Sequence, residues 1–429
     1  MSDTIFALSS GAPPAAIAVV RISGPDAALA LTALAGRKLP PRKAVTVSLH
    51  NADGALLDRA LGLWLPGPAT ATGEDTLELH CHGGRAVVAA VEAALARVPG
   101  LRRAEAGEFT RRAFTNGRID LAEAEGLADL LASETEVQRQ TAMAMVGGVF
   151  SRQIGQWRER LLGLSAAVEA VLDFADEDDV SALPEDFVLR LTALREEIAL
   201  WLDRPRAEVL REGFRVVLAG PPNAGKSTLF NALVESDAAI TAPVAGTTRD
   251  VLTHPVAISG IPFRFVDTAG LRDAVGDTVE AIGVERARAA ADAADLILWL
   301  GPEGQGPEQG LGQVWEIEAQ VDVPGHARKR APRHRLSAIA GDGMNALRGD
   351  LVATARAALP RPGEAALSMR QHRLIAEAAE ALASAEAVRD PLLVAEGLRL
   401  TRVAFDALLG RTTTEDMLDA LFGRFCIGK

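Results

Sequence analysis

The stretch "GPPNAGKST" at residues 220–228 decides the fold of the middle of the chain. It follows the strand-like run "FRVVLAG" at 214–220 and precedes the helix-like run "TLFNALV" at 228–234, the context that a phosphate-binding loop needs. In such a loop, backbone N–H groups and the helix N-terminus hold phosphate oxygens, a lysine pairs with the β and γ oxygens, and a hydroxyl ligates magnesium. The pattern gives these last two roles to Lys226 and Ser227, and it predicts nucleotide contacts from Asn223, Ala224, Gly225, Lys226, Ser227 and Thr228.

Two further motifs follow in the order and spacing of a GTPase, "GTTRD" at 246–250 and "DTAG" at 267–270. Asp267 is expected to hold magnesium through water, Thr248 to close a switch over the γ-phosphate, and the Gly270 N–H to sense that phosphate. The predicted nucleotide contacts therefore extend to Thr247, Thr248, Asp267, Thr268, Ala269 and Gly270.

The residue after "DTAG" is Leu271, where many GTPases have a glutamine that orients the attacking water. A leucine cannot do this, so another polar group must position the water. The following loop, "LRDAVGDTVEAIG", offers Asp273, Asp277 and Glu280. Arg249 lies near these motifs in the sequence but is no obvious arginine finger. A monovalent cation held by Asn223 and switch carbonyls is an alternative source of positive charge.

The base-reading motif Asn-Lys-x-Asp is absent as such. The candidate in register is "AQVD" at 319–322, which keeps Asp322 as the acceptor for the guanine ring and lacks the Asn and Lys. The run "LSAIAG" at 336–341 fits the next base-contacting loop and adds Ser337 and Ala338. We expect a preference for guanine.

The rest of the chain predicts a multi-domain α+β and α/β protein. Residues 1–118 mix β-rich runs with one helical stretch, residues 119–211 have helical spacing alone, residues 212–360 alternate strands and helices as in a Ras-like P-loop domain, and helical spacing resumes over 361–429. The α/β segment is therefore expected to be inserted into one helical domain. The core of that domain is predicted to include the stripe Ile154, Trp157, Leu161, Leu164, Val168 and Leu172.

Composition narrows the class of protein. With 429 residues, of which 48% are hydrophobic, the chain is long enough for two to three folded domains. Its net charge of -12 argues against a broad electrostatic grip on nucleic acid, so any RNA contact should be local or delegated to a partner. No secretory signal and no apolar run of membrane-spanning length is visible, so we expect a cytoplasmic protein without a membrane segment.

Taken together, the inserted GTPase-like segment, "AIAVVRISG" at 16–24, "AEAGEFTRRAFTNGRIDLAEAE" at 104–125 and "FCIGK" at 425–429 resemble the MnmE (TrmE) family of tRNA modification GTPases. The resemblance covers essentially the whole chain. It implies an N-terminal domain that binds folate and forms a homodimer, and potassium-dependent pairing of the GTPase domains. It also implies a heterotetramer with the FAD- and NADH-dependent partner MnmG, which places an aminomethyl or carboxymethylaminomethyl group on the wobble uridine of certain tRNAs.

The resemblance also assigns cofactor sites. It implies a site for 5,10-methylenetetrahydrofolate or 5-formyltetrahydrofolate formed by Arg21, Glu78, Arg118 and Lys429, with Arg118 in a position where the family often has Lys. It makes Glu280 the catalytic glutamate that acts on the attacking water through a second water. It implies magnesium at Ser227 and Thr248, and potassium held by Asn223 with backbone groups of Ala242, Val244 and Thr247.

Cys426, one of two cysteines, is the fourth residue from the end and permits three interpretations. The first is a prenylation box, which is disfavoured because such a box has aliphatic residues in its middle and seldom ends in Lys, whereas this chain has "CIGK". A buried, inert thiol between Phe425 and Ile427 agrees with the apolar neighbours. A reactive thiol carried to the one-carbon donor, acting as nucleophile or acid/base, agrees with the family resemblance.

Two other stretches bear on metal binding and on RNA binding. In "HCHGG" at 80–84, strand alternation is expected to point His80 and His82 to one face and Cys81 to the other, which argues against a metal site. The basic run "RKRAPRHR" at 328–335 is expected to be solvated, with contact to tRNA or a partner as the alternative.

Overall fold

The computed structural model describes residues 3–173, 183–204, 207–235, 239–240, 253–267, 292–307, 313–361, 363–412 and 414–429. The chain divides into two compact units, residues 1–128 with 406–429 and residues 129–405. Several predicted site residues lie outside the described residues: Ala242, Val244, Thr247, Thr248, Thr268, Ala269, Gly270 and Glu280.

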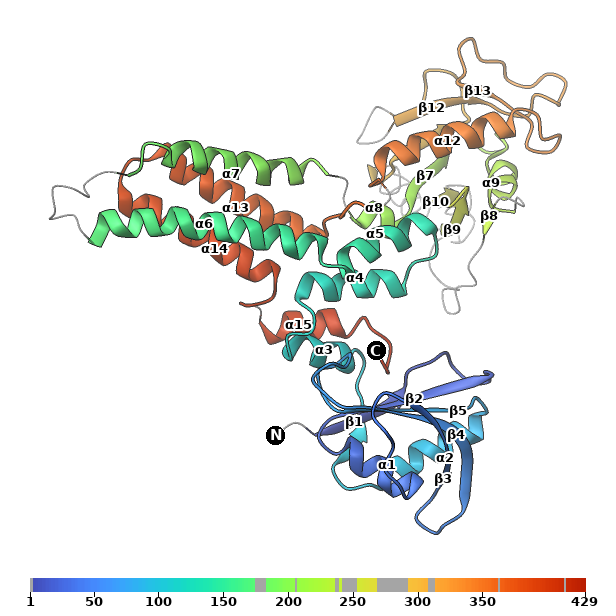
Figure 1. The fold of residues 1–429 in the computed structure, drawn as a ribbon. Coiled ribbons are helices and arrows are strands. Elements are labelled where there is room, and N and C mark those ends of the chain that lie inside the picture. The colour runs from blue at the N-terminus through green and yellow to red at the C-terminus, as the bar shows by residue number, and fades with distance from the viewer. Residues whose placement is uncertain are drawn as a thin grey trace, which may run out of the picture. The chain divides into compact units, whose positions relative to one another are not determined.

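The first unit is built on a mixed six-stranded sheet of order β3-β4-β5-β2-β1-β6. The strands are β1 (Thr4–Leu8), β2 (Ile17–Ser23), β3 (Ala44–His50), β4 (Leu56–Leu65), β5 (Thr76–His82) and β6 (Leu101–Arg103). All neighbouring strands pair in antiparallel orientation except β1 and β6, which are parallel to each other. Alternating side chains of the strands form a core with α1 (Ala27–Ala35) and α2 (Arg85–Leu95), which lie on one face of the sheet (Figure 1). The alternate residues, Arg21 and Glu78 among them, therefore lie on the other face.

The C-terminal segment of the chain belongs to this first unit. Helix α15 (Glu415–Phe422) packs with α3 (Glu108–Thr115) and with the start of α4 (Leu121–Leu131) around a small apolar core. That core contains Phe422 and Phe425. The contacts thus group residues 406–429 with the N-terminal residues, whereas the sequence prediction joined them to the helical domain. Residues 406–429 join the first unit because Phe422 and Phe425 are buried in this apolar core. The domain boundaries predicted from the sequence stay predictions.

The second unit contains a helical bundle. Its helices are α5 (Glu136–Val146), α6 (Val149–Asp173), α7 (Phe187–Leu202), α13 (Met369–Ala387) and α14 (Pro391–Leu408), the last of which continues past residue 405 (Figure 1). Helices α7 and α13 come from opposite flanks of the α/β segment, and the Arg195 Nε donates to Glu386 Oε2 at 2.7 Å between them. Helical residues from both flanks therefore do pack together, as the sequence predicted.

The predicted apolar stripe on α6 is buried from Ile154 to Val168, with one difference at its end. Val171 is buried and Leu172 is only half-buried, because a step of three residues from Val168 follows the bundle seam better than a step of four. Trp157 is fully buried and stacks on Phe405 with ring centroids 5.9 Å apart.

The α/β part of the second unit has a seven-stranded sheet of order β13-β12-β11-β7-β10-β9-β8. The strands are β7 (Phe214–Ala219), β8 (Ala239–Ile240), β9 (Thr253–Ile258), β10 (Ile261–Asp267), β11 (Leu296–Trp299), β12 (Gln313–Glu318) and β13 (His334–Arg335). The strands from β13 to β10 run parallel, and β9 and β8 complete an antiparallel edge. With α8 (Ala207–Glu212), α9 (Lys226–Val234) and α12 (Met344–Ala358), this arrangement confirms the predicted multi-domain α+β and α/β fold.

Among the described residues, no helix combines the length and the apolar character needed to cross a membrane.

Candidate functional site

The phosphate-binding loop connects the central strand β7 to helix α9. Gly225 is the N-cap of α9 at φ +89°, a left-handed conformation that glycine adopts without strain. Asn223 is also left-handed, at φ +61°. The loop therefore turns sharply and delivers the chain into the N-terminus of a helix, where backbone N–H groups and the helix dipole favour a phosphate.

Lys226 and Ser227, the first two residues of α9, have polar partners around the loop. Lys226 is buried, and its Nζ donates to the carbonyls of Gly220 at 3.0 Å and Pro221 at 2.8 Å. The Ser227 hydroxyl lies 2.8 Å from Oδ2 of Asp267, which ends strand β10 beside β7. The pair supplies two hard oxygen donors at the carboxyl ends of adjacent parallel strands, and this donor set fits magnesium.

The predicted base-reading residues meet beside this loop. A cavity of about 60 Å³ is lined by Asp322 and Ala338 together with Gly225 and Thr228 of the phosphate loop and helix α9. Ser337 is fully buried and serves its own loop, since its hydroxyl accepts from the Ala340 N–H at 3.0 Å. The turn "AQVD" thus follows β12 and lies beside the phosphate loop, and its role in reading the base stays a prediction.

The sequence reasoning missed Gln320 in that turn. Its Nε2 donates to the backbone carbonyl of Asn223 at 3.2 Å, so the side chain links the base-reading turn to the phosphate loop. In the sequence, the feature that could have indicated Gln320 was its position two residues before Asp322.

The basic run at 328–335 is largely paired within its own domain. Lys329 is buried and pairs with Glu316, and Arg335 pairs with Glu318 at 3.1 Å. Arg333 lies 4.2 Å from the ring centroid of Trp315. The arginines at 328, 330, 333 and 335 are nevertheless exposed, so the run is largely solvated as expected, and contact with tRNA or a partner stays a prediction.

In the first unit, Arg21 and Glu78 face each other across β2 and β5. Their side chains are bonded through Arg21 Nη2 and Glu78 Oε1 at 2.9 Å, and the Arg21 guanidinium lies 5.8 Å from the ring centroid of Phe109. Arg118 is exposed and lies against Gly73, where an added Cβ would be 3.2 Å from Arg118 Cγ. The structure thus joins Arg21 and Glu78 directly, and Arg118 and Lys429 belong to the same unit as that pair.

The C-terminal tail folds onto this unit through its backbone. Ile427 forms an antiparallel bridge with Ala106, and the Gly107 N–H points to the Cys426 carbonyl at 3.5 Å. Gly428, at φ +95°, lies so close to β1 that a Cβ there would be 2.0 Å from the Leu8 carbonyl oxygen. Phe425 is buried, but Cys426 is exposed, so the interpretation of an inert core thiol is wrong.

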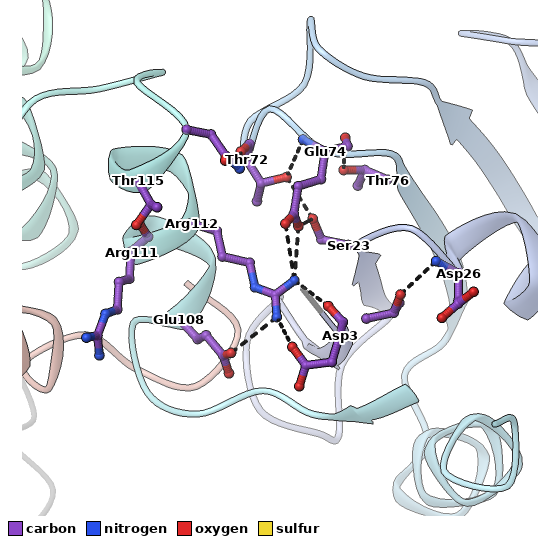
Figure 2. Close-up of polar contacts among 12 residues, drawn as sticks. Asp3, Ser23, Asp26, Thr72, Glu74, Thr76, Glu108, Arg111, Arg112 and Thr115 are labelled. Atoms are coloured by element: carbon purple, nitrogen blue, oxygen red, sulfur yellow. Dashed lines mark hydrogen bonds and ion pairs between the residues drawn. The ribbon is translucent and has the colours of Figure 1, made fainter. Parts of the chain in front are cut away.

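An ion-pair network around Arg112 joins α3 to Asp3 and Glu74 (Figure 2). The Arg112 guanidinium contacts Asp3, Glu74 and Glu108, and the Ser23 hydroxyl also donates to Glu74 at 2.8 Å. Arg111 pairs with Glu415 and Asp419 of α15. Burial alone would raise the pKa of Glu108, but hydrogen bonds from Arg102 and the Glu105 N–H hold that pKa below its ordinary value. The spacing of these residues in the sequence gives no signal for the network.

The "HCHGG" stretch behaves as a strand should. Cys81 points into the core, where burial and the nearby Asp58 carboxylate raise the pKa of its thiol to about 12. His80 and His82 point to the other face and contact Glu78 and Asp58. Among the described residues, no three His, Cys, Asp or Glu side chains form a group that could hold a metal ion.

The loop, the Ser227 and Asp267 pair, and the parallel sheet define a P-loop nucleotide-binding domain of the GTPase class, carried by a chain with an α+β N-terminal unit and a helical bundle. Residues 4–118 match the family model described as the GTP-binding protein TrmE N-terminus, and residues 121–426 match the model of the MnmE helical domain. The chain belongs to the MnmE family of tRNA modification GTPases.

Curated relatives match along the full length. The tRNA modification GTPase MnmE of Novosphingobium aromaticivorans is 64% identical over 439 residues, covering 100% of both chains. That of Erythrobacter litoralis is 61% identical over 427 residues, again covering 100% of both. Among solved structures, the G domain of the T. maritima FeoB iron transporter covers 33% of this chain and 98% of its own at 23% identity and a TM-score of 0.23, too low to support any argument.

Proposed function

We propose that this protein hydrolyses GTP and, together with MnmG, modifies the wobble uridine of certain tRNAs with an aminomethyl or carboxymethylaminomethyl group. The observation that carries the proposal is the 2.8 Å contact of Ser227 with Asp267 at the phosphate loop, in a chain that matches tRNA modification GTPases over its whole length. The cytoplasm, where tRNA is used, is the proposed compartment.

In the GTPase step, Lys226 and the helix N-terminus hold the β and γ phosphates, and Asp322 with Ala338 reads the guanine. Ser227 and Asp267 would hold a magnesium ion, which would supply positive charge beside the phosphate oxygens. Thr248 and Gly270 are proposed as the switch contacts of the γ-phosphate. Glu280 is proposed to act on the attacking water through a second water, the role that Leu271 cannot fill.

Potassium is the proposed source of the remaining positive charge, held by Asn223 and backbone groups of Ala242, Val244 and Thr247. Potassium and GTP are proposed to pair two GTPase domains within the homodimer, and that movement drives the modification. Hydrolysis measured in equal concentrations of potassium and sodium chloride tests the ion; equal rates would overturn this role of Asn223.

In the first unit, we propose a tetrahydrofolate site that includes Arg21, Glu78, Arg118 and Lys429 and takes 5,10-methylenetetrahydrofolate or the 5-formyl form. The bonded Arg21 and Glu78 pair on the outer face of the sheet supports it, because a carboxylate accepts hydrogen bonds from the N–H groups of a heterocycle. The exposed thiol of Cys426, carried by a docked tail, is proposed to act on the one-carbon unit.

The test is nucleoside mass spectrometry of total tRNA from cells that lack this protein and are complemented by variants. Wild type and Cys81→Ala, which changes the other cysteine, should restore the modified wobble uridine, and Cys426→Ser should not. Purified Cys426→Ser should hydrolyse GTP at the wild-type rate, because its thiol belongs to the first unit and the phosphate loop to the second. If deletion leaves the nucleoside unchanged, the modification proposal fails; if Cys426→Ser restores it, only the thiol's role fails.

A further inference from the structure

The face of the sheet that carries Arg21 and Glu78 continues into a second polar group. Ser23 and Thr76 form the next outward-facing pair along β2 and β5, two residues from Arg21 and Glu78 in the strand register. Ser23 is nevertheless fully buried, and its hydroxyl donates to Glu74 Oε2 at 2.8 Å. The Glu74 carboxylate is therefore bonded to β2 one outward-facing position away from Arg21.

The other partner of this carboxylate is Arg112 on α3 (Figure 2). Arg112 Nη1 lies 3.2 Å from each carboxylate oxygen of Glu74, and it also donates to the Asp3 backbone carbonyl at 2.7 Å. The side chains of Arg112 and Glu74 are only 13% and 15% exposed, so solvent and salt screen this pair less than a surface pair. Glu74 thus joins α3 to the sheet.

The loop that leads to Glu74 also supports Arg118. Asn116, which ends α3, donates through Nδ2 to the Thr72 carbonyl at 2.7 Å. Gly73 follows in a left-handed conformation at φ +81°, and a Cβ built there would lie only 3.2 Å from Arg118 Cγ. The stem of Arg118 therefore lies on the backbone between Thr72 and Glu74, so the position of this loop determines where Arg118 can lie.

Helix α3 also supports Arg21. Phe109 lies three residues before Arg112 on this helix and is buried, and the Arg21 guanidinium is 5.8 Å from the centroid of its ring. A movement of α3 away from the sheet would therefore change the surroundings of Arg21. Both arginines of the proposed tetrahydrofolate site thus lie on elements that the pair of Glu74 and Arg112 fastens together.

We propose that Glu74 is a positioning residue for the tetrahydrofolate site. Its carboxylate is occupied by Ser23 and Arg112, so it acts by holding β2, α3 and the loop at Gly73 in one arrangement. In that arrangement Arg21 and Arg118 are in place before the ligand arrives, which lowers the cost of ordering them on binding. The proposal rests on the proposed folate site and adds a residue that does not touch the ligand.

The test is isothermal titration calorimetry of 5-formyltetrahydrofolate with purified full-length variants. Glu74→Gln keeps the shape of the side chain and an acceptor for Ser23, but it loses the charge that holds Arg112. We expect it to raise the Kd about tenfold, the value of one charge-assisted hydrogen bond. Arg112→Lys keeps the charge but cannot reach Asp3 and Glu74 together, so it should raise the Kd by about three- to tenfold.

Glu92→Gln is the matched control. Glu92 is a carboxylate of the same unit with 17% of its side chain exposed, and it pairs with Arg103 at 3.0 Å. It belongs to α2, which covers the opposite face of the sheet from Arg21. Glu92→Gln therefore removes a comparable ion pair at a distance from the site, and it should bind 5-formyltetrahydrofolate as the wild type does.

Two readouts separate positioning from a general loss of stability. The double variant Glu74→Gln with Arg112→Lys should bind no more weakly than Glu74→Gln alone, because both changes break the same connection. Hydrogen exchange in Glu74→Gln should be faster at the Arg118 N–H, which donates to the Ala113 carbonyl of α3, and it should be unchanged there in Glu92→Gln.

Wild-type affinity of Glu74→Gln, or an equal loss of affinity in Glu92→Gln, would overturn the proposal, whatever happens to the melting temperature. If Glu74→Gln fails to fold, wild-type affinity of Arg112→Lys overturns it instead. A wild-type protein that does not bind 5-formyltetrahydrofolate would overturn the proposed folate site together with this proposal, and the proposed GTP hydrolysis would stand.

Discussion

Adding one methyl group near the C-terminus should separate tRNA modification from GTP hydrolysis. In Gly428→Ala, the new Cβ would lie 2.0 Å from the Leu8 carbonyl oxygen and 2.9 Å from its carbon, both backbone atoms that cannot rotate away. Since carbon and oxygen ordinarily approach to about 3.3 Å, the tail must move by more than about 1 Å. A displacement of that size at a reacting group costs about 100-fold in rate, so we expect a loss of about that size in modification.

The assay is wobble-uridine modification by the purified protein with MnmG, beside GTP hydrolysis by the same preparation. Hydrolysis should be unchanged, because the phosphate loop belongs to the other unit. Hydrogen exchange measured by mass spectrometry should show faster exchange at residues 424–429 and at the Gly107 N–H, whose acceptor is the Cys426 carbonyl.

Gly54→Ala is the matched control. Gly54 is also left-handed, at φ +82°, but an added Cβ there meets nothing within 4 Å. It therefore carries the same strain of about 1–2 kcal/mol without the clash, and modification should stay at the wild-type level. Normal modification by Gly428→Ala, despite faster exchange in the tail, would refute the link between tail position and chemistry.

Three other substitutions test the nucleotide site, the helical core and the ion-pair network. In a competition binding assay, Asp322→Asn should weaken the binding of GTP relative to that of xanthosine triphosphate by about 10- to 100-fold, the value of a hydrogen bond to a charged group. An unchanged preference would show that another turn reads the base. Trp157→Ala should lower the free energy of unfolding by about 3–5 kcal/mol in urea titrations, because Trp157 is fully buried against Phe405 and Trp201; a loss below 1 kcal/mol would contradict that packing. Glu108 has a lowered pKa in the folded state, so its stabilisation is present above the ordinary value of 4.5 and fades as the pH falls below it. Glu108→Gln should therefore flatten the acid side of the stability profile, and an unchanged slope would show that the network does not depend on this charge.

Local patterns predicted the elements of this chain well. The run before "GPPNAGKST" is β7 and the run after it is α9, because a strand, a glycine turn and a helix N-terminus are each specified by residues close in sequence. The alternation in "HCHGG" likewise predicted that Cys81 and the two histidines would face opposite ways. On α6 the buried apolar stripe was predicted except at its end. Whether Val171 or Leu172 is buried there depends on the partner helix and not on α6 itself.

The sequence by itself determined the class of fold and the family, and it predicted the chemistry of the phosphate loop, since these depend on short spacings and on motifs that occur together. It left the state of Cys426 open, because burial of a terminal thiol depends on where the tail docks. Only the tertiary structure decided that the tail bridges Ala106, that Cys426 is exposed, and that Gln320 reaches Asn223 from a turn about 97 residues away. The network around Arg112 is of the same kind, because it joins charges from three separate segments that only folding brings within hydrogen-bond distance.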